Sequence, residues 1–237
     1  MKEAYEALAK NPANFTALTP LSFLQRTADI YGGREAIIYG DQSYTWRQCH
    51  ERCLRMAASL TELGIGKGDT VAVLAFNTPE MFEAHFFVPM TGAVLNTINT
   101  RLDAETLAYI LDFGEVKALF VDRELLPLTE SALQITKSNP TLILIDDETA
   151  LQKPAVKLEV IQYEELLQSG DPEFRCPPLE DEWQALSLNY TSGTTGKPKG
   201  VVYHHRGAYL MSMGTAAGWE LPNHPRYLYS VPMFHCN

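Results

Sequence analysis

The sequence predicts an α/β fold: doubly wound, mostly parallel sheets with flanking helices. Three short apolar runs, TVAVLAF (70–76), VKALFVD (116–122) and TLILIDD (141–147), each have the form of a strand that is buried on both faces. Segments with helical periodicity alternate with these runs, and this order is typical of parallel sheets with right-handed crossovers. Ligands of such sheets bind beyond the carboxyl ends of the strands.

The chain before residue 70 is expected to form two helices and a hairpin. The expected elements are a helix over 20–32, strands at 35–40 and 43–45, and a helix over 46–63. Thr19 is the predicted N-cap of the first helix, Thr45 is that of the second, and Gly64 ends the second. Cys49 and Cys53 lie on the apolar stripe of the second helix, where we interpret them as core residues.

A polar, proline-containing segment at 148–182 divides the chain. The elements expected after residue 77 are helices over about 78–91 and 103–113, a helix between the strands at 116–122 and 141–147, an edge strand at 157–162, a helix near 163–169, a strand at 185–190 and a helix from about His205. We interpret 148–182 as a connection between two sheet units. Residues 1–147 are then the first α/β sheet unit, and residues 183–237 begin the second.

The composition indicates a folded, intracellular protein. Hydrophobic residues make up 46% and charged residues 20% of the chain, which is typical of a globular domain. The net charge of −10 argues against nucleic acid and anionic lipid as partners, because both are polyanions. The N-terminal MKEAYEALAKNP lacks the apolar stretch of a secretory signal, and no later segment is long enough to span a bilayer. We therefore predict a cytoplasmic protein without stable membrane insertion.

A loop rich in hydroxyls, glycines and lysines follows the strand predicted at 185–190. The loop residues of interest in TSGTTGKPKG (191–200) are Thr191, Ser192, Gly193, Thr194, Thr195, Gly196, Lys197, Lys199 and Gly200. Glycines let backbone N–H groups approach a ligand, hydroxyls add neutral donors, and lysines add charge against a polyphosphate. The pattern predicts a phosphate-binding loop between a strand end and a helix start; the alternative is a flexible linker.

The spacing of the loop excludes the commonest nucleotide-binding motifs. A Walker A loop needs a glycine five residues before its Gly-Lys pair and a Ser or Thr after it, but Thr191 and Pro198 occupy these positions. The glycines at 64–68 do not fit a dinucleotide-binding motif, because Asp69 stands where the third glycine is required. Kinase, GTPase and dehydrogenase functions therefore lose their main support.

The segment YTSGTTGKPKG (190–200) resembles the phosphate loop of the adenylate-forming (AMP-binding) superfamily at essentially every position. VPMFHCN (231–237) is similar to the motif that places a His or an aromatic residue beside the acyl site of that family. Further similar segments are NPAN (11–14), LTPLSFL (18–24), YTW (44–46), KGDTVAVLAFNTPE (67–80), EAHFFVPMTGAVLN (83–96) and TRLDAET (100–106). They indicate a subgroup of acyl-CoA synthetases that includes plant acyl-activating enzymes, benzoate-CoA ligase-like proteins and methylmercaptopropionate-CoA ligases.

The resemblance implies an enzyme that activates a carboxylic acid with ATP and transfers the acyl group to coenzyme A. The residues that it implies for the β- and γ-phosphates of ATP are Thr191, Ser192, Gly193, Thr194, Thr195, Gly196 and Lys199. Lys197 precedes Pro198 and is expected to face solvent, with a weaker place in the nucleotide site. Thr191 is the implied hydroxyl ligand of Mg²⁺. His235, which follows the strand-like run YLYSVPMF, is implied at the acyl site, so Lys199 and His235 are the implied catalytic residues.

Several parts of the family pattern are missing, including the adenine-contacting stretch, the ribose-binding Asp and the C-terminal lysine. We therefore interpret residues 1–237 as an incomplete N-terminal AMP-binding domain that lacks turnover alone. One alternative is an adenylation domain that loads the thiol of a carrier protein, and another is a non-catalytic nucleotide-binding fragment. Adjacent His204 and His205 are expected to point in different directions and not to bind a metal together. A homodimer is left open.

Overall fold

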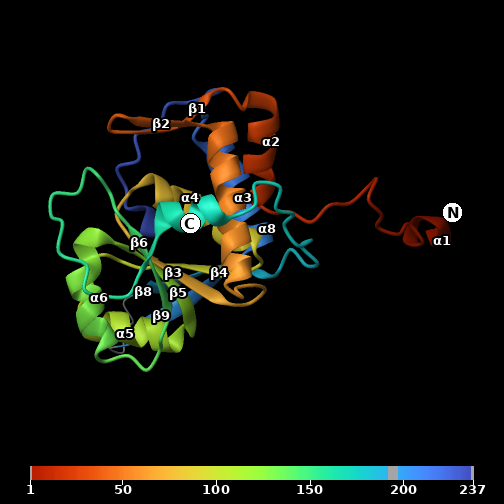
Figure 1. The fold of residues 1–237 in the computed structure, drawn as a ribbon. Coiled ribbons are helices and arrows are strands. Elements are labelled where there is room, and N and C mark those ends of the chain that lie inside the picture. The colour runs from red at the N-terminus through yellow and green to blue at the C-terminus, as the bar shows by residue number, and fades with distance from the viewer. Residues whose placement is uncertain (1, 192–196, 236–237) are drawn as a thin grey trace.

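The computed structural model describes residues 2–191 and 197–235, and a central sheet organises it (Figure 1). The strands are β1 (Glu35–Tyr39), β2 (Gln42–Thr45), β3 (Thr70–Leu74), β4 (Val94–Thr97), β5 (Val116–Asp122), β6 (Thr141–Ile145), β7 (Ile161–Gln162), β8 (Ala185–Thr191) and β9 (Lys199–His204). Seven of them form one sheet in the order β7-β6-β5-β3-β4-β8-β9, and β1 and β2 form a separate hairpin. Neighbours in the large sheet pair in parallel except β8 and β9, which confirms the predicted fold class.

Helices cover both faces of the sheet. The α-helices are α1 (Lys2–Glu6), α2 (Leu21–Tyr31), α3 (Trp46–Glu62), α4 (Pro79–Met90), α5 (Ala104–Phe113), α6 (Leu126–Leu133), α7 (Tyr163–Ser169) and α8 (His205–Gly218), and the 3-10 helices are η1 (Arg123–Leu125) and η2 (Met233–His235). α3, α4 and α7 pack on one face, whereas α5 and α6 pack on the other. Figure 1 also shows α1 at the end of an extended segment, away from the body of the domain.

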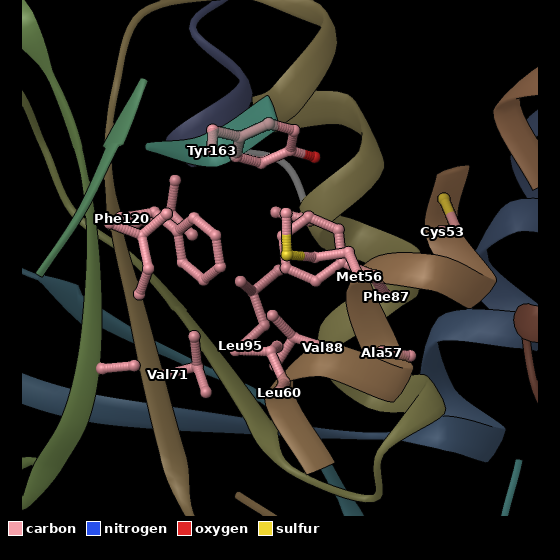
Figure 2. Close-up of a cluster of buried hydrophobic side chains, with 14 of the residues drawn as sticks. Cys53, Met56, Ala57, Leu60, Val71, Phe87, Val88, Leu95, Phe120 and Tyr163 are labelled. Atoms are coloured by element: carbon pink, nitrogen blue, oxygen red, sulfur yellow. The ribbon is translucent and has the colours of Figure 1, made fainter. Parts of the chain in front are cut away.

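The larger core lies between the sheet and the helix pair α3 and α4. Figure 2 shows Met56 of α3, Phe87 of α4 and Phe120 of β5 side by side, with Tyr163 above them. The rings of Phe87 and Phe120 lie 5.1 Å apart in a tilted arrangement, which is a favourable geometry for aromatic pairs. Cys53 is fully buried in the same core. The structure therefore places it as the periodicity predicts.

Caps explain where several helices begin. The Oγ1 of Thr45 accepts the N–H of Gln48 at 3.3 Å, and the Oε1 of Gln48 accepts the N–H of Thr45 at 2.8 Å, so a capping box opens α3. The prediction for α2 is wrong by one residue, because Pro20 is the N-cap and the helix begins at Leu21. Thr19 still contributes, since its Oγ1 accepts the N–H of Leu21 at 3.3 Å.

Two short strands were not predicted from the sequence, and two predicted strands are corrected. β4 was missed because VLNT is short and contains Asn, and β9 was missed because Lys199 and Gly200 were assigned to the loop and no element was assigned to 201–204. The predicted edge strand at 157–162 is reduced to the two residues of β7. The strand-like run 227–234 forms an irregular segment, with one bend at Val231, and the start of η2. Hydrogen bonds with the side chain of Asn77, and not the ladder of a strand, hold it in place.

The second predicted sheet unit begins with strands that join the first sheet. β8 pairs in parallel with β4 through Leu95 and Ser187, and β9 forms the edge. Residues 1–147 therefore share their sheet with the strands that follow the 148–182 connection. The division of the chain into units stays a prediction.

Gly170, directly after α7, provides a test of how closely α7 packs on α3. A β-carbon at this position would lie 1.9 Å from the carbonyl oxygen of Arg55 and 2.7 Å from the Oγ of Ser59. We expect Gly170→Ala to lower the free energy of unfolding by about 1–3 kcal/mol, because the helices must separate to admit the methyl group. Urea denaturation measures this change. Gly66→Ala is the matched control, since nothing lies within 4 Å of its added β-carbon, and equal stability of the two variants would contradict the predicted clash.

Candidate functional site

The two ends of the predicted phosphate loop lie on two paired strands, β8 and β9. β8 and β9 pair antiparallel, with Tyr190 opposite Gly200 and Thr191 opposite Lys199. The loop therefore connects two strands, which corrects the expectation that it runs from a strand directly into a helix. The reason is the run KGVVYH, whose β-branched and aromatic residues extend the ladder before α8 begins. The predicted ligands Ser192, Gly193, Thr194, Thr195 and Gly196 lie outside the described residues.

The two lysines of the loop lie beside a groove between α5 and these two strands. The groove has a volume of about 590 Å³, and its lining includes Tyr109, Phe113, Tyr190, Lys197, Lys199 and Val202. Lys197 is exposed, as expected, and its Nζ lies 5.5 Å from the centre of the Tyr109 ring. Lys199 is also exposed, directly across the ladder from Thr191. This edge of the acidic chain thus presents two cations and one hydroxyl to a ligand.

Thr97, at the end of β4, connects the loop-bearing strand to the segment that carries His235. Its Oγ1 donates to the carbonyl oxygen of Phe234 at 2.9 Å and lies 3.2 Å from the Oδ1 of Asn189. Asn189 is two residues before Thr191, and Phe234 immediately precedes His235. The two sequence motifs, separated by some thirty residues of chain, therefore meet at the carboxyl edge of β4 and β8.

The turn after β3 holds the same C-terminal segment. The Oδ1 of Asn77 accepts the N–H of Met233 at 2.8 Å, and its Nδ2 donates to the carbonyl oxygen of Val231 at 2.8 Å. Phe234 enters the core at 8% exposure, while His235 stays exposed with its ring 4.6 Å from that of Phe234. β3 is also where the strand order turns back, with β4 on one side and β5 on the other. Ligand crevices of doubly wound sheets lie at such points.

Sequence reasoning missed Asn77, Thr97 and Tyr109, which position this site. Asn77 directly follows the predicted strand at 70–76 and was given no role, and Thr97 lies in an element that was not predicted. The contact between Thr97 and Phe234 spans 137 residues of sequence, so local spacing carries no signal for it.

A buried carboxyl group, that of Asp122, also lies at the carboxyl edge, at the end of β5. Burial, together with the negative charges of Asp147, Glu124 and Glu80, raises the pKa of Asp122 to about 6, although the Glu124 N–H that donates to this carboxyl lowers it. In the part of the chain that the structure describes, no three His, Cys, Asp or Glu side chains are arranged to hold a metal ion. We assign no ligand to Asp122.

The neighbouring histidines at the start of α8 have separate roles. The Nδ1 of His204 accepts the N–H of Gly207 at 2.9 Å and so caps α8, and its ring lies 4.4 Å from that of Trp183. His205 is buried, with its Nδ1 2.8 Å from the Oγ1 of Thr19. The two rings thus have different partners, as expected from their adjacency.

His205 predicts a loss of stability in acid. Burial lowers the pKa of His205 to about 4, below its ordinary value of 6.5. The folded state disfavours the protonated ring. The contribution of the neutral His205 ring to the free energy of unfolding is therefore complete above pH 6.5 and is lost as the pH falls toward 4. We expect His205→Gln to flatten the dependence of the melting temperature on pH in this interval. An unchanged slope would contradict a buried neutral His205, and His224→Gln at an exposed position is the control.

Together the fold and the site define an α/β domain that carries a hydroxyl-, glycine- and lysine-rich loop at the carboxyl edge of its sheet. The model of the AMP-binding enzyme family matches residues 24–237, and the chain belongs to this family. Among the helices in the described ranges, none combines the length and the apolar composition needed to cross a bilayer.

Several curated relatives of the chain are CoA ligases. The chain is 49% identical over 240 residues to acetate–CoA ligase CCL3 of Humulus lupulus, covering 97% of this chain and 42% of that protein. It is 46% identical over 239 residues to a peroxisomal benzoate–CoA ligase of Arabidopsis thaliana, covering 97% and 41%. The chain therefore spans about two fifths of the length of these relatives.

Solved structures share the fold. The inhibitor-bound N-terminal domain of FACL13 from Mycobacterium tuberculosis superposes with a TM-score of 0.71 at 29% identity, covering 92% of this chain and 52% of that one. A long-chain-fatty-acid–CoA ligase from Archaeoglobus fulgidus superposes with a TM-score of 0.80 at 22% identity, covering 93% and 43%. The second likeness concerns the fold alone.

Proposed function

We propose that this chain is the nucleotide-phosphate-binding part of an ATP-dependent acyl-CoA synthetase. The reaction converts a carboxylic acid, ATP and coenzyme A to acyl-CoA, AMP and pyrophosphate through an acyl-adenylate. The observation that carries the proposal is the position of Thr97, which links the strand of the loop to the segment of His235. Family membership and the CoA-ligase relatives support the same reaction.

In this proposal the residues act mainly by electrostatics. A carboxylate oxygen of the acid attacks the α-phosphorus of ATP, the bond to the bridging oxygen breaks, and pyrophosphate leaves with the electron pair. Lys199 and the loop donors, from Thr191 to Gly196, bind the departing phosphates, where negative charge increases. Lys197 has a secondary place because it faces Tyr109. His235 lines the path of the acid and the thiol.

The described residues at this edge of the sheet fit the phosphates of ATP and a Mg²⁺ ion bound to them. Lys197 and Lys199 supply positive charge at one edge of a chain with a net charge of −10, and Thr191 supplies a hydroxyl beside them. Mg²⁺ bound to nucleotides keeps several water and phosphate ligands, so one protein hydroxyl suits it. When bound, the ion would neutralise charge on the polyphosphate. The Mg²⁺ ligand Thr191 and a homodimer both stay predictions.

The names of the relatives suggest small acids as substrates. They include acetate, butyrate, 2-methylpropanoate, benzoate and trans-cinnamate ligases. We propose a short- or medium-chain or an aromatic acid for this protein. The cytoplasmic location stays a prediction. Several relatives are named as peroxisomal, so a peroxisomal location is the alternative.

The test uses the complete gene product that carries this chain. It is incubated with ATP, Mg²⁺, each of these acids and either coenzyme A or a carrier-protein thiol, and the formation of AMP and thioester is measured. Acid-dependent AMP release with coenzyme A supports the proposal. Transfer only to the carrier, or nucleotide binding without AMP release, would contradict it. We expect the 237 residues alone to show no turnover.

A further inference from the structure

Two rings of α5 support both ends of the loop. Tyr109 and Phe113 stack with their centres 5.5 Å apart. The ring of Tyr190, which directly precedes Thr191, meets Phe113 edge-on at 6.4 Å, and the Nζ of Lys197 lies 5.5 Å from the centre of the Tyr109 ring. The residues on either side of 191–196 therefore rest on one aromatic pair, so the position of Tyr190 affects the start of the loop.

Two residues near this support, Tyr190 and Asn96, carry buried polar atoms that lack a hydrogen-bond partner. The Oη of Tyr190 and both amide atoms of Asn96 have no hydrogen-bond partner within the described part of the chain, and Asn96 is fully buried. A β-carbon on Gly114 would lie 3.3 Å from the Oη of Tyr190 and 3.6 Å from the Nδ2 of Asn96. The phenol and the amide therefore face the same small space, which the glycine leaves open. Buried polar groups in native proteins nearly always find a partner.

We propose that Tyr190 and Asn96 are positioning residues, in which the phenol donates a hydrogen bond to the Asn96 carboxamide oxygen and fixes the end of β8 for the loop. A half-turn of the Asn96 amide exchanges its nitrogen and its oxygen, so that the oxygen faces the space beside Gly114 that the phenol also faces. Burial raises the pKa of Tyr190 to about 12, so the phenol keeps its proton at neutral pH and remains a donor. The inference rests on the proposed function, because the loop is positioned for nucleotide phosphates.

This hydrogen bond can fix the direction in which the chain leaves β8 although neither residue contacts substrate. Tyr190 pairs with Gly200 on β9, and a β-carbon there would lie 2.9 Å from Leu188 and 3.7 Å from the Tyr190 ring. Glycines at 114 and 200 thus leave room for the ring on both sides. Thr191 is the next residue along β8, so its position depends on the position of the Tyr190 ring.

The first test measures ATP–pyrophosphate exchange in the complete gene product for Tyr190→Phe, Asn96→Leu and the double variant. We expect each single variant to raise the KM for ATP about tenfold with kcat changed less than about twofold, and the double variant to equal a single one, because all three lack the same hydrogen bond. Ser187→Ala is the matched control: its Oγ is also buried and unpaired on β8, but on the opposite face, and we expect no change. An unchanged KM, or single effects that multiply in the double variant, would overturn the proposal.

A second measurement does not depend on activity. Hydrogen exchange of the amides at 199–204 is expected to be several-fold faster in Tyr190→Phe than in the wild type or in Ser187→Ala. If the wild type shows no pyrophosphate exchange, the proposed function fails, and hydrogen exchange alone then decides the inference. Equal protection in the wild type and Tyr190→Phe would overturn it.

Discussion

Replacing Arg52 with alanine is expected to lower the free energy of unfolding by about 3–5 kcal/mol, the largest effect on stability that the structure predicts. Arg52 of α3 connects three helices. Its Nε donates to the Oε1 of Glu83 on α4 at 2.5 Å, and its Nη2 donates to the Oε1 of Glu164 on α7 at 2.6 Å. The guanidinium also lies 4.8 Å from the centre of the Tyr44 ring. Without it, the carboxylate of Glu83 stays buried without a cation.

The size of this effect depends on pH. Burial raises the pKa of Glu83 to about 7, although Arg52 and the hydroxyl of Tyr163, 2.7 Å away, both lower it. A carboxyl whose folded pKa is raised favours the folded state most when protonated, so its contribution is present below pH 4.5 and is lost as the pH rises through 7. The loss of Arg52 raises this pKa further. We therefore expect Arg52→Ala to cost less at pH 5 than at pH 8.

Urea denaturation at these two pH values checks the prediction. Arg226→Ala is the control, because its ion pair with Glu35 is long, at 3.5 Å, and highly exposed, and such pairs contribute about 0–1 kcal/mol. Adding Glu83→Gln to Arg52→Ala should recover part of the loss, since the amide needs no counter-ion. A loss below about 1 kcal/mol at both pH values would contradict a buried charge at Glu83.

The sheet could be predicted from the sequence where the strands are long and apolar. β3, β5 and β6 are buried on both faces, and this gives them continuous hydrophobic runs. β4 and β9 were missed because their strand character comes from pairing with neighbours: β4 is short and contains Asn, which is a poor strand former alone, and β9 depends on β8. The strand-like run before His235 shows the converse, since its apolar pattern suits a strand but the Asn77 side chain holds it in an irregular conformation.

For the site, sequence indicated the chemistry but not the geometry. The hydroxyls and lysines of the loop are adjacent in sequence, so their combined character is visible without a structure. Thr191 and Lys199 are cross-strand neighbours only because of the register of two antiparallel strands. The contact of Thr97 with Phe234 forms only when the whole sheet is folded. Burial of the Tyr190 hydroxyl likewise depends on where α5 ends, at Gly114.

Replacing Lys199 with alanine is expected to lower the rate of ATP–pyrophosphate exchange in the complete gene product by about 100- to 1000-fold, or 2.7–4 kcal/mol of barrier. Lys199 is exposed at the first position of β9, opposite Thr191, so its charge can meet a phosphate without the cost of leaving a buried cation unpaired. The loss should fall on kcat, because negative charge on the pyrophosphate grows in the transition state. The stability of the protein should be unchanged.

Two lysine variants separate this role from a general effect of charge. Lys117→Ala also removes an exposed lysine, one paired with Asp69 at 2.6 Å, and should exchange pyrophosphate at the wild-type rate. Lys199→Arg keeps the charge and should retain more activity than Lys199→Ala, although the wider guanidinium cannot reproduce the position of the ammonium. If Lys199→Ala exchanges pyrophosphate within about twofold of the wild type, Lys199 does not stabilise the leaving group. Thr191 and Ser192–Gly196 would then have to bind the terminal phosphates with neutral donors alone, in a chain whose net charge of −10 repels them.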